Sequence, residues 1–271
     1  MERRLMWTLP ATAAILGLAA PGRASARAPD SVQLLDRILK RGVIRITAEV
    51  TSPPFGFMNK ANEPDGLEIS AARQMAKDLG VKIDLVQVTG PDRIPALLSG
   101  RADVAISSLS ITLARAKTIA FANPHGALSI VIAAPAGTKI TGPADLVGKR
   151  IGLTRATLEE ATVPKEAPKG TRLVYFDDMA ATMQALISGQ IDAAGMSGFA
   201  AKSVSDRDPA KHIVPHFTVT TAYYAAAVKP GDWDLLHWIN AWVFIKKQDG
   251  FLADIYKKYT GLTLPELPVV S

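Results

Sequence analysis

The pattern of apolar and polar positions predicts strands and helices that alternate along most of the chain. Apolar residues recur at helical spacing over residues 69–79 and alternate over residues 81–88, as in a strand. Strands are expected at residues 43–48, 81–88, 102–106, 149–154, 171–176 and 223–228, and helices at residues 69–79, 94–98, 178–188, 233–247 and 251–259. This order favours βαβ units and a mostly parallel sheet, which is an α/β fold.

Local signals refine several of these helices. Asp92 and Asp177 are expected to cap the helices that begin at residues 94 and 178, because a carboxylate can accept from free N–H groups at a helix start. The large apolar residues of the helix at residues 233–247 are expected in the core: Trp233, Leu236, Trp238, Ile239, Trp242 and Phe244.

One internal repeat is present. Residues 96–105 (ALLSGRADVA) resemble residues 185–194 (ALISGQIDAA), and each copy reads as the end of a helix, a Ser-Gly stop and a strand. The first copy runs into Ser107 and Ser108, and the second runs into Met196 and Ser197. Ligands of open α/β sheets bind beyond the carboxyl ends of strands. Two similar lobes with a cleft between these strand ends are therefore expected.

Residues 1–26 have the pattern of a secretory signal peptide. Arg3 and Arg4 give a basic start, an apolar run covers residues 6–20, and the small-x-small sequence Ala-Ser-Ala ends at Ala26. The apolar run is shorter than the roughly 20 residues that span a bilayer. Cleavage after Ala26 and export to the periplasm are expected.

Composition narrows the function classes. The 271 residues are 48% apolar and contain no cysteine, which excludes disulfides, thiol nucleophiles and Cys-based metal sites. With only four histidines, neither a metal site nor a cofactor is expected. The formal charge of +6 falls to +4 without residues 1–26, and no block of like charges suggests a nucleic-acid partner.

Seven segments resemble, in order, family 3 extracellular solute-binding proteins, the periplasmic receptors of polar amino-acid ABC transporters. They are residues 53–55 (PPF), 66–69 (GLEI), 93–97 (RIPAL), 108–115 (SLSITLAR), 121–124 (FANP), 146–152 (LVGKRIG) and 188–193 (SGQIDA). The resemblance covers essentially the whole chain after the predicted signal peptide.

The resemblance implies a type II-like periplasmic-binding-protein fold with two α/β lobes joined by two hinge strands, which close on a ligand. One lobe would comprise residues 27–130 and 225–271, and the other residues 131–224. The hinge crossings would lie near residues 128–132 and 219–225.

The resemblance also implies a carboxylate site. Arg115 would clamp the carboxylate, because a guanidinium presents two parallel donors to it. Ser108 and Ser110 would supply further donors. Thr157, at the start of a helix-like segment, would contact the same anion from the other lobe.

The sequence departs from the family pattern where the ligand's ammonium would bind. Ser197 stands at the position of the usual Asp, and Ser52 stands where an aromatic platform is common. A neutral hydroxyl cannot balance a buried ammonium, so Glu49 is expected to compensate if it reaches the cleft. Two further candidates are Arg155, which could bind a second anionic group of the ligand, and His125.

These observations predict a monomeric periplasmic solute-binding protein that captures a small amino acid or related carboxylate for an ABC permease. A binding protein for a non-amino organic acid, a periplasmic enzyme like cyclohexadienyl dehydratase and a receptor sensing domain are the alternatives. The enzyme would need an acid among Glu49, Glu159, Glu160 and His125. Glu159 and Glu160 are instead expected to be charges on an exposed helix face, so no enzyme activity is predicted.

Overall fold

The computed structural model describes residues 33–269. The predicted signal peptide and its cleavage site lie outside the described residues. Within residues 33–269, no helix is long and apolar enough to cross a membrane.

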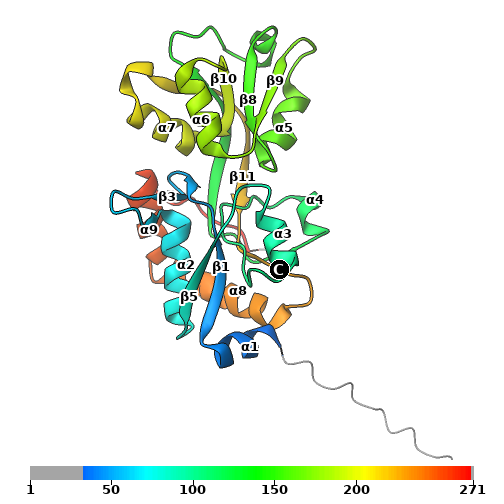
Figure 1. Ribbon diagram of the computed structural model, residues 1–271, viewed down its shortest axis with the longest axis vertical. Coiled ribbons are helices and arrows are strands. Elements are labelled where there is room, and N and C mark those ends of the chain that lie inside the picture. The colour runs from blue at the N-terminus through cyan, green and yellow to red at the C-terminus, as the bar shows by residue number, and fades with distance from the viewer. Residues whose placement is uncertain (1–32, 270–271) are drawn as a thin grey trace, which may run out of the picture. The chain divides into compact units, whose positions relative to one another are not determined.

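One group of elements is built on the parallel pair β1 (Val43–Ala48) and β5 (Lys82–Gln87). A hydrophobic core joins these strands to the helices around them. The helices are α1 (Leu34–Arg41), α2 (Leu67–Asp78), α8 (Trp233–Gln248) and α9 (Phe251–Thr260). Because α8 and α9 come from the end of the chain, this lobe is assembled from two separate stretches of sequence (Figure 1).

A second group surrounds a five-stranded sheet in the order β11-β7-β10-β8-β9. The strands β8 (Arg150–Thr154), β9 (Arg172–Phe176) and β10 (Ala193–Ser197) are parallel to one another. Helices α5 (Leu158–Glu166), α6 (Met179–Ser188) and α7 (Gly198–Arg207) accompany them, and apolar side chains from the strands and helices form two further core clusters. The described residues thus form two α/β lobes with separate cores, as the resemblance implies (Figure 1).

Two long antiparallel strands link the lobes (Figure 1). They are β7 (Gly126–Pro135) and β11 (Ile213–Tyr224), paired from Gly126 with Tyr224 to Pro135 with Ile213. Their far ends belong to the five-stranded sheet, while their near ends lie beside β6 (Ala120–Phe121) and β12 (Ala227–Val228) of the first lobe. The predicted crossings at residues 128–132 and 219–225 fall on this pair.

The remaining elements are short. They are β2 (Thr51–Ser52), β3 (Gly56–Met58), β4 (Pro64–Asp65), α3 (Arg93–Leu98), α4 (Leu113–Ala116) and the 3-10 turns η1 (Pro143–Leu146) and η2 (Pro209–Lys211). At the start of α3 the Asp92 carboxylate accepts no hydrogen bond from a helix N–H, because it accepts from the Thr89 hydroxyl instead.

The internal repeat makes the same Arg–Asp contact in both lobes. In the first copy the Asp103 carboxylate accepts from the backbone N–H of Arg45 at 2.8 Å and from its guanidinium at 2.7 Å. In the second copy Asp192 accepts from the backbone N–H of Arg150 at 2.7 Å and from its guanidinium at 2.7 Å. Each repeat therefore fixes its final segment to a neighbouring strand, β1 in the first lobe and β8 in the second.

Several sequence expectations need correction. Residues 102–106 form only isolated bridges, from Val104 to Ile46 and from Ala105 to Ala227, because the chain crosses from one neighbour to another within two residues. The expected strand at residues 223–228 is interrupted between β11 and β12. Asp178, not Asp177, caps α6 by accepting from the N–H of Ala181.

Two aromatic residues predicted in the core of α8 are exposed. Trp233 is 52% exposed and Phe244 is 57% exposed. The buried face of α8 consists of Leu235, Leu236, Ile239, Trp242 and Val243. Trp233 begins the helix, and Phe244 lies just beyond the stripe that packs on the core, so neither faces inward.

Candidate functional site

A small cavity between the lobes is lined by all seven principal candidates from the sequence. These are Glu49, Ser52, Ser108, Ser110, Arg115, Thr157 and Ser197. Its volume is about 30 Å³, which is roughly the share of liquid volume of one water molecule. The lobes are therefore closed around this point, and a larger ligand requires them to separate.

Arg115 lies on α4, whose first turn is capped by the Thr112 hydroxyl. Its Nη1 donates to the Ser110 carbonyl at 2.9 Å, and its Nη2 donates to the carbonyl of Ala156 in the other lobe at 2.8 Å. Burial lowers the pKa of Arg115 to about 10, and the nearby Arg93 charge contributes to this shift. A desolvated cation with no carboxylate within 4 Å among residues 33–269 is suited to an anionic ligand.

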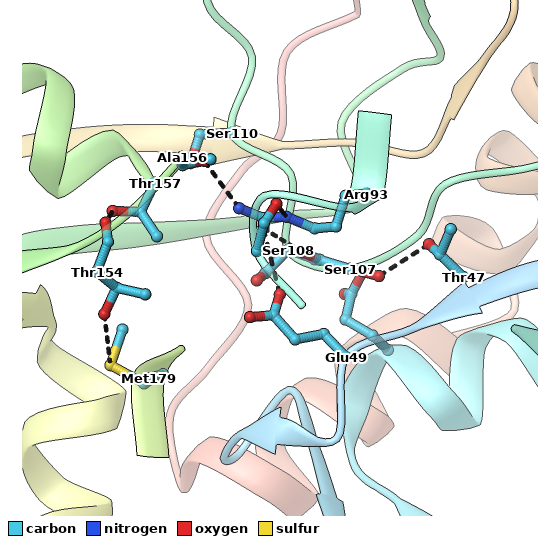
Figure 2. Close-up of polar contacts among 12 residues, drawn as sticks. Thr47, Glu49, Arg93, Ser107, Ser108, Ser110, Thr154, Ala156, Thr157 and Met179 are labelled. Carbon is cyan, nitrogen blue, oxygen red and sulfur yellow. Dashed lines mark hydrogen bonds and ion pairs between the residues drawn. The ribbon is translucent and has the colours of Figure 1, made fainter. Parts of the chain in front are cut away.

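Arg93 also lines the cavity, although the sequence reasoning did not select it. It is the first residue of α3 and only 4% exposed. Its Nη1 donates to the Ser107 carbonyl at 2.9 Å, and its Nη2 donates to the Ala156 carbonyl at 3.0 Å (Figure 2). The sequence did contain a sign of this role. Arg93 belongs to the otherwise apolar segment RIPALL, and an arginine buried with such a segment needs hydrogen-bond acceptors.

Glu49 follows β1 and lines the cavity, which is the condition that the sequence left open. Its Oε2 lies 3.4 Å from Nη1 of Arg93, and both side chains are almost fully buried (Figure 2). Burial raises the pKa of Glu49, while the positive charge of Arg93 opposes that shift. Glu49 is therefore already paired with a cation of the cavity wall.

Ser108 and Ser110 bring the loop before α4 to the cavity. Ser108 has a φ of 46°, and its backbone N–H donates to Oε2 of Glu68 at 3.1 Å. Oε1 of Glu68 also lies 3.0 Å from Nε2 of His125. His125 is buried against the Tyr224 ring and does not line the cavity. Its position supports the Ser108 loop through Glu68.

The other lobe contributes the start of α5. Thr157 caps this helix, because its hydroxyl accepts from the N–H of Glu160 and donates to the Thr154 carbonyl at 2.6 Å. Ala156 has a φ of 57°, and its N–H donates to Oε2 of Glu160 at 2.6 Å. The Ala156 carbonyl is thereby directed toward the two arginines of the first lobe.

Glu159 corrects the expectation of an exposed helix face. It is only 5% exposed and lines the cavity, because α5 begins at the contact between the lobes. Burial raises its pKa, and hydrogen bonds from its own backbone N–H and from Thr157 oppose the shift. Among the described residues, no Lys, Arg or His nitrogen forms an ion pair with it within 4 Å.

Three other candidates have local roles. Ser197 lines the cavity and caps α7, because its hydroxyl accepts from the N–H of Ala200 at 3.0 Å. Ser52 lines the cavity from β2. Arg155 does not line it, since its Nε lies 3.3 Å from Oδ1 of Asp177 and its guanidinium stacks on Tyr175.

The cavity combines two guanidinium groups with two carboxyl groups and several hydroxyls. Its apolar walls come from Phe55, Leu128, Ile130, Leu158 and Met179. No group of three or more potential metal-ligating side chains occurs within residues 33–269. The chemistry is that of a binding site for a small polar, charged molecule.

Known proteins resemble this chain over most of its length. Residues 44–262 match the family described as bacterial extracellular solute-binding proteins, family 3. The L-cystine-binding protein TcyJ of Escherichia coli (strain K12) is 29% identical over 231 residues, which cover 84% of this chain and 86% of that protein. The ABC transporter glutamine-binding protein GlnH of Bacillus subtilis (strain 168) is 28% identical over 210 residues, with 76% of each chain covered.

Solved structures show the same fold. The crystal structure of the ancestral amino acid-binding protein AncCDT-1, a precursor of cyclohexadienyl dehydratase, superposes with a TM-score of 0.78 at 30% identity. The match covers 83% of this chain and 99% of that chain. The two-lobed architecture predicted from the sequence is therefore confirmed.

Proposed function

Because this chain belongs to the bacterial extracellular solute-binding proteins of family 3, we propose that it captures a small amino acid or related carboxylate and delivers it to an ABC transporter permease. The observation that carries the proposal is the cavity between the lobes, where Arg115 and Thr157 approach from opposite sides. Arg115 donates only to neutral backbone carbonyls and has no carboxylate within 4 Å among the described residues.

The proposed ligand carboxylate occupies the space beside Arg115. In the closed arrangement, Nη2 of Arg115 donates to the Ala156 carbonyl. A carboxylate would replace this neutral acceptor with a charge-assisted, bidentate partner, which is a stronger interaction. Ser108 and Ser110 lie on the same side of the cavity and are proposed to donate to the ligand.

The curated relatives are named as binding proteins of transporters, which confirms the prediction that the chain is not an enzyme. The dehydratase alternative is therefore not favoured. A non-amino organic acid remains the second candidate ligand, because Ser197 is neutral and Glu49 is already paired with Arg93.

The proposed function requires that the protein is exported and that its two lobes move relative to each other. We propose that residues 1–26 are a signal peptide, that the exported protein is a periplasmic monomer, and that residues 27–130 with 225–271 close against residues 131–224. Intact-mass measurement of protein from the periplasmic fraction should find Arg27 as the first residue, and light scattering should find one chain per particle.

A thermal-shift panel tests the function on protein purified from the periplasm of cells that express the full chain. L-amino acids and small organic acids are tested, and a ligand at 100 times its Kd should add about 2.7 kcal/mol to the free energy of unfolding. Arg115→Ala should abolish the rise in Tm, and Arg115→Lys should reduce it, because an ammonium lacks the paired donors. Arg155→Ala should leave it unchanged, because Arg155 lies outside the cavity.

A ligand response that survives in Arg115→Ala would overturn the carboxylate clamp. A wild-type protein that responds to no member of the panel would overturn the proposed function itself.

A further inference from the structure

The cavity lacks an obvious partner for a ligand ammonium at the position of Ser197. The Ser197 hydroxyl is neutral and already accepts from the N–H of Ala200. A desolvated ammonium needs a negative charge nearby, because an unpaired buried charge is costly. Any zwitterionic ligand must find that charge elsewhere in the cavity.

Glu49 is a poor source of this charge. Its carboxylate lies 3.4 Å from the Arg93 guanidinium, and both groups are almost fully buried. Since Arg93 has no second carboxylate within 4 Å among residues 33–269, moving Glu49 to a ligand would leave a buried guanidinium without a counter-ion. Glu49 and Arg93 therefore form one neutral unit of the cavity wall.

Glu159 is the remaining acidic group of the cavity. It is 5% exposed, lines the space from the second lobe, and forms no ion pair within the described part of the chain. Glu159 lies on the second lobe and Arg115 on the first, so a molecule that carries both a carboxylate and an ammonium can contact the two residues from within the cavity. Burial raises the pKa of Glu159, while two hydrogen bonds and the positive charges of Arg93 and Arg115 oppose that shift.

We propose that Glu159 pairs with the cationic group of a zwitterionic ligand whose carboxylate binds Arg115. The charges then balance in three pairs: Glu49 with Arg93, the ligand carboxylate with Arg115, and the ligand ammonium with Glu159. This inference rests on the proposed function, and it selects α-amino acids over carboxylates that lack the amine.

The selection has a physical origin in the charge of one residue. With Glu159 ionised, the cavity side chains carry no net charge, and a neutral zwitterion preserves that balance. A carboxylate without an amine would face an unpaired Glu159 carboxylate, unless that group takes up a proton. Glu159 therefore distinguishes an amino acid from its deaminated analogue.

The test compares the L-amino acids and L-cystine with their matched 2-hydroxy acids, in which a hydroxyl replaces the α-ammonium. Calorimetry on the exported protein measures both Kd values for each pair. The wild type should favour the amino acid, and Glu159→Gln should weaken amino-acid binding roughly 100-fold, the scale of breaking a buried ion pair. Binding of the hydroxy acid should change less than tenfold, because Gln has the shape of the protonated carboxyl group.

Glu166→Gln is the matched control, because it removes the same charge from an exposed position on α5 and should leave both Kd values unchanged. Tm measurements without ligand verify that each variant is folded. Should Glu159→Gln retain the wild-type preference for the amine, or should the wild type show no such preference, this inference is wrong while the proposed function stands. If either of these results is found while Arg115→Ala abolishes all binding, the carboxylate site stands and only the role of Glu159 is wrong.

Discussion

At the scale of single residues, a backbone carbonyl joins the two lobes. The carbonyl of Ala156 accepts from Arg93 at 3.0 Å and from Arg115 at 2.8 Å, although both arginines belong to the other lobe. Its direction depends on the left-handed conformation of Ala156, with a φ of 57°. This conformation costs about 1 kcal/mol for a residue with a Cβ atom.

A substitution to glycine tests the importance of this conformation. Ala156→Gly should raise the free energy of unfolding by up to about 1 kcal/mol, because glycine adopts a positive φ without strain. Ala161→Gly, an exposed position inside α5, should lower it by about 1 kcal/mol. Urea unfolding of the two variants measures both changes. If Ala156→Gly also lowers the free energy of unfolding, the backbone of Ala156 is not strained.

Charged residues show where prediction from sequence reaches its limit. The Ile-Thr-x-x-Arg segment was sufficient to select Arg115, because the family that the chain resembles assigns carboxylate binding to the arginine of this motif. Arg93 and Glu159 were missed because their burial depends on contacts across the lobe boundary, such as the bond from Arg93 to Ala156, 63 residues away in the chain. Neither helical periodicity nor residue type contains that information.

At the scale of elements, the repeated Arg–Asp pair joins the final segment of each repeat to a neighbouring strand, β1 in one lobe and β8 in the other. Asp103 is almost fully buried, with 1% of its side chain exposed, and contacts both Arg41 and Arg45. Asp192 is 36% exposed and contacts Arg150. The aspartate of the motif is therefore buried in one lobe and partly exposed in the other. The two sites allow the effect of burial on the stability of one type of ion pair to be measured.

The two aspartates should differ in their contribution to stability. Asp103→Asn should lower the free energy of unfolding by about 2 kcal/mol, since it removes a buried carboxylate that two partly exposed arginines contact, and Asp192→Asn by about 1 kcal/mol or less. Hydrogen bonds from Arg150 hold the pKa of Asp192 below its ordinary value. Its contribution is therefore complete above the unfolded pKa near 3.8 and is lost as the pH falls through the lower folded pKa.

Urea unfolding at neutral and acidic pH measures these changes. The difference between wild type and Asp192→Asn should be largest at neutral pH and vanish in strong acid. A difference that grows as the pH falls would contradict the assigned ion pair.

Most elements could be predicted from the sequence, and the exceptions have local causes. The strand β1 has the predicted bounds, residues 43–48, because its alternation and the following turn are both clear. The strand predicted at residues 102–106 is not formed. Val104 bridges to Ile46, whereas the next residue, Ala105, bridges to Ala227. Apolar composition alone does not show which partner a strand will find.

At the scale of the whole molecule, Phe199 of the second lobe packs against aromatic residues of the first. Its ring centroid lies 5.9 Å from that of Phe55, a wall residue of the cavity, and 5.7 Å from that of Tyr256 on α9. Both pairs are edge-on, and such pairs contribute about 0.5–1.5 kcal/mol each. These contacts stabilise the closed arrangement independently of any ligand.

Removal of this ring should favour the open form. Phe199→Ala should weaken ligand binding roughly tenfold or more, because the two lost aromatic pairs oppose closure. Calorimetry measures the affinity, and small-angle scattering of the unliganded protein should show a larger radius of gyration. Phe244→Ala removes an exposed ring from α8 and should change neither quantity. Wild-type affinity and compactness in Phe199→Ala would contradict this role.

The carbonyl of Ala156 also has a kinetic consequence. A cavity of about 30 Å³ admits no amino acid while both arginines hold that carbonyl. Ligand must then associate with molecules that have already opened, so the observed association rate levels off at the opening rate as concentration rises. The hydrogen bonds from Arg93 and Arg115 to Ala156 thereby contribute to the rate at which a scarce solute is captured.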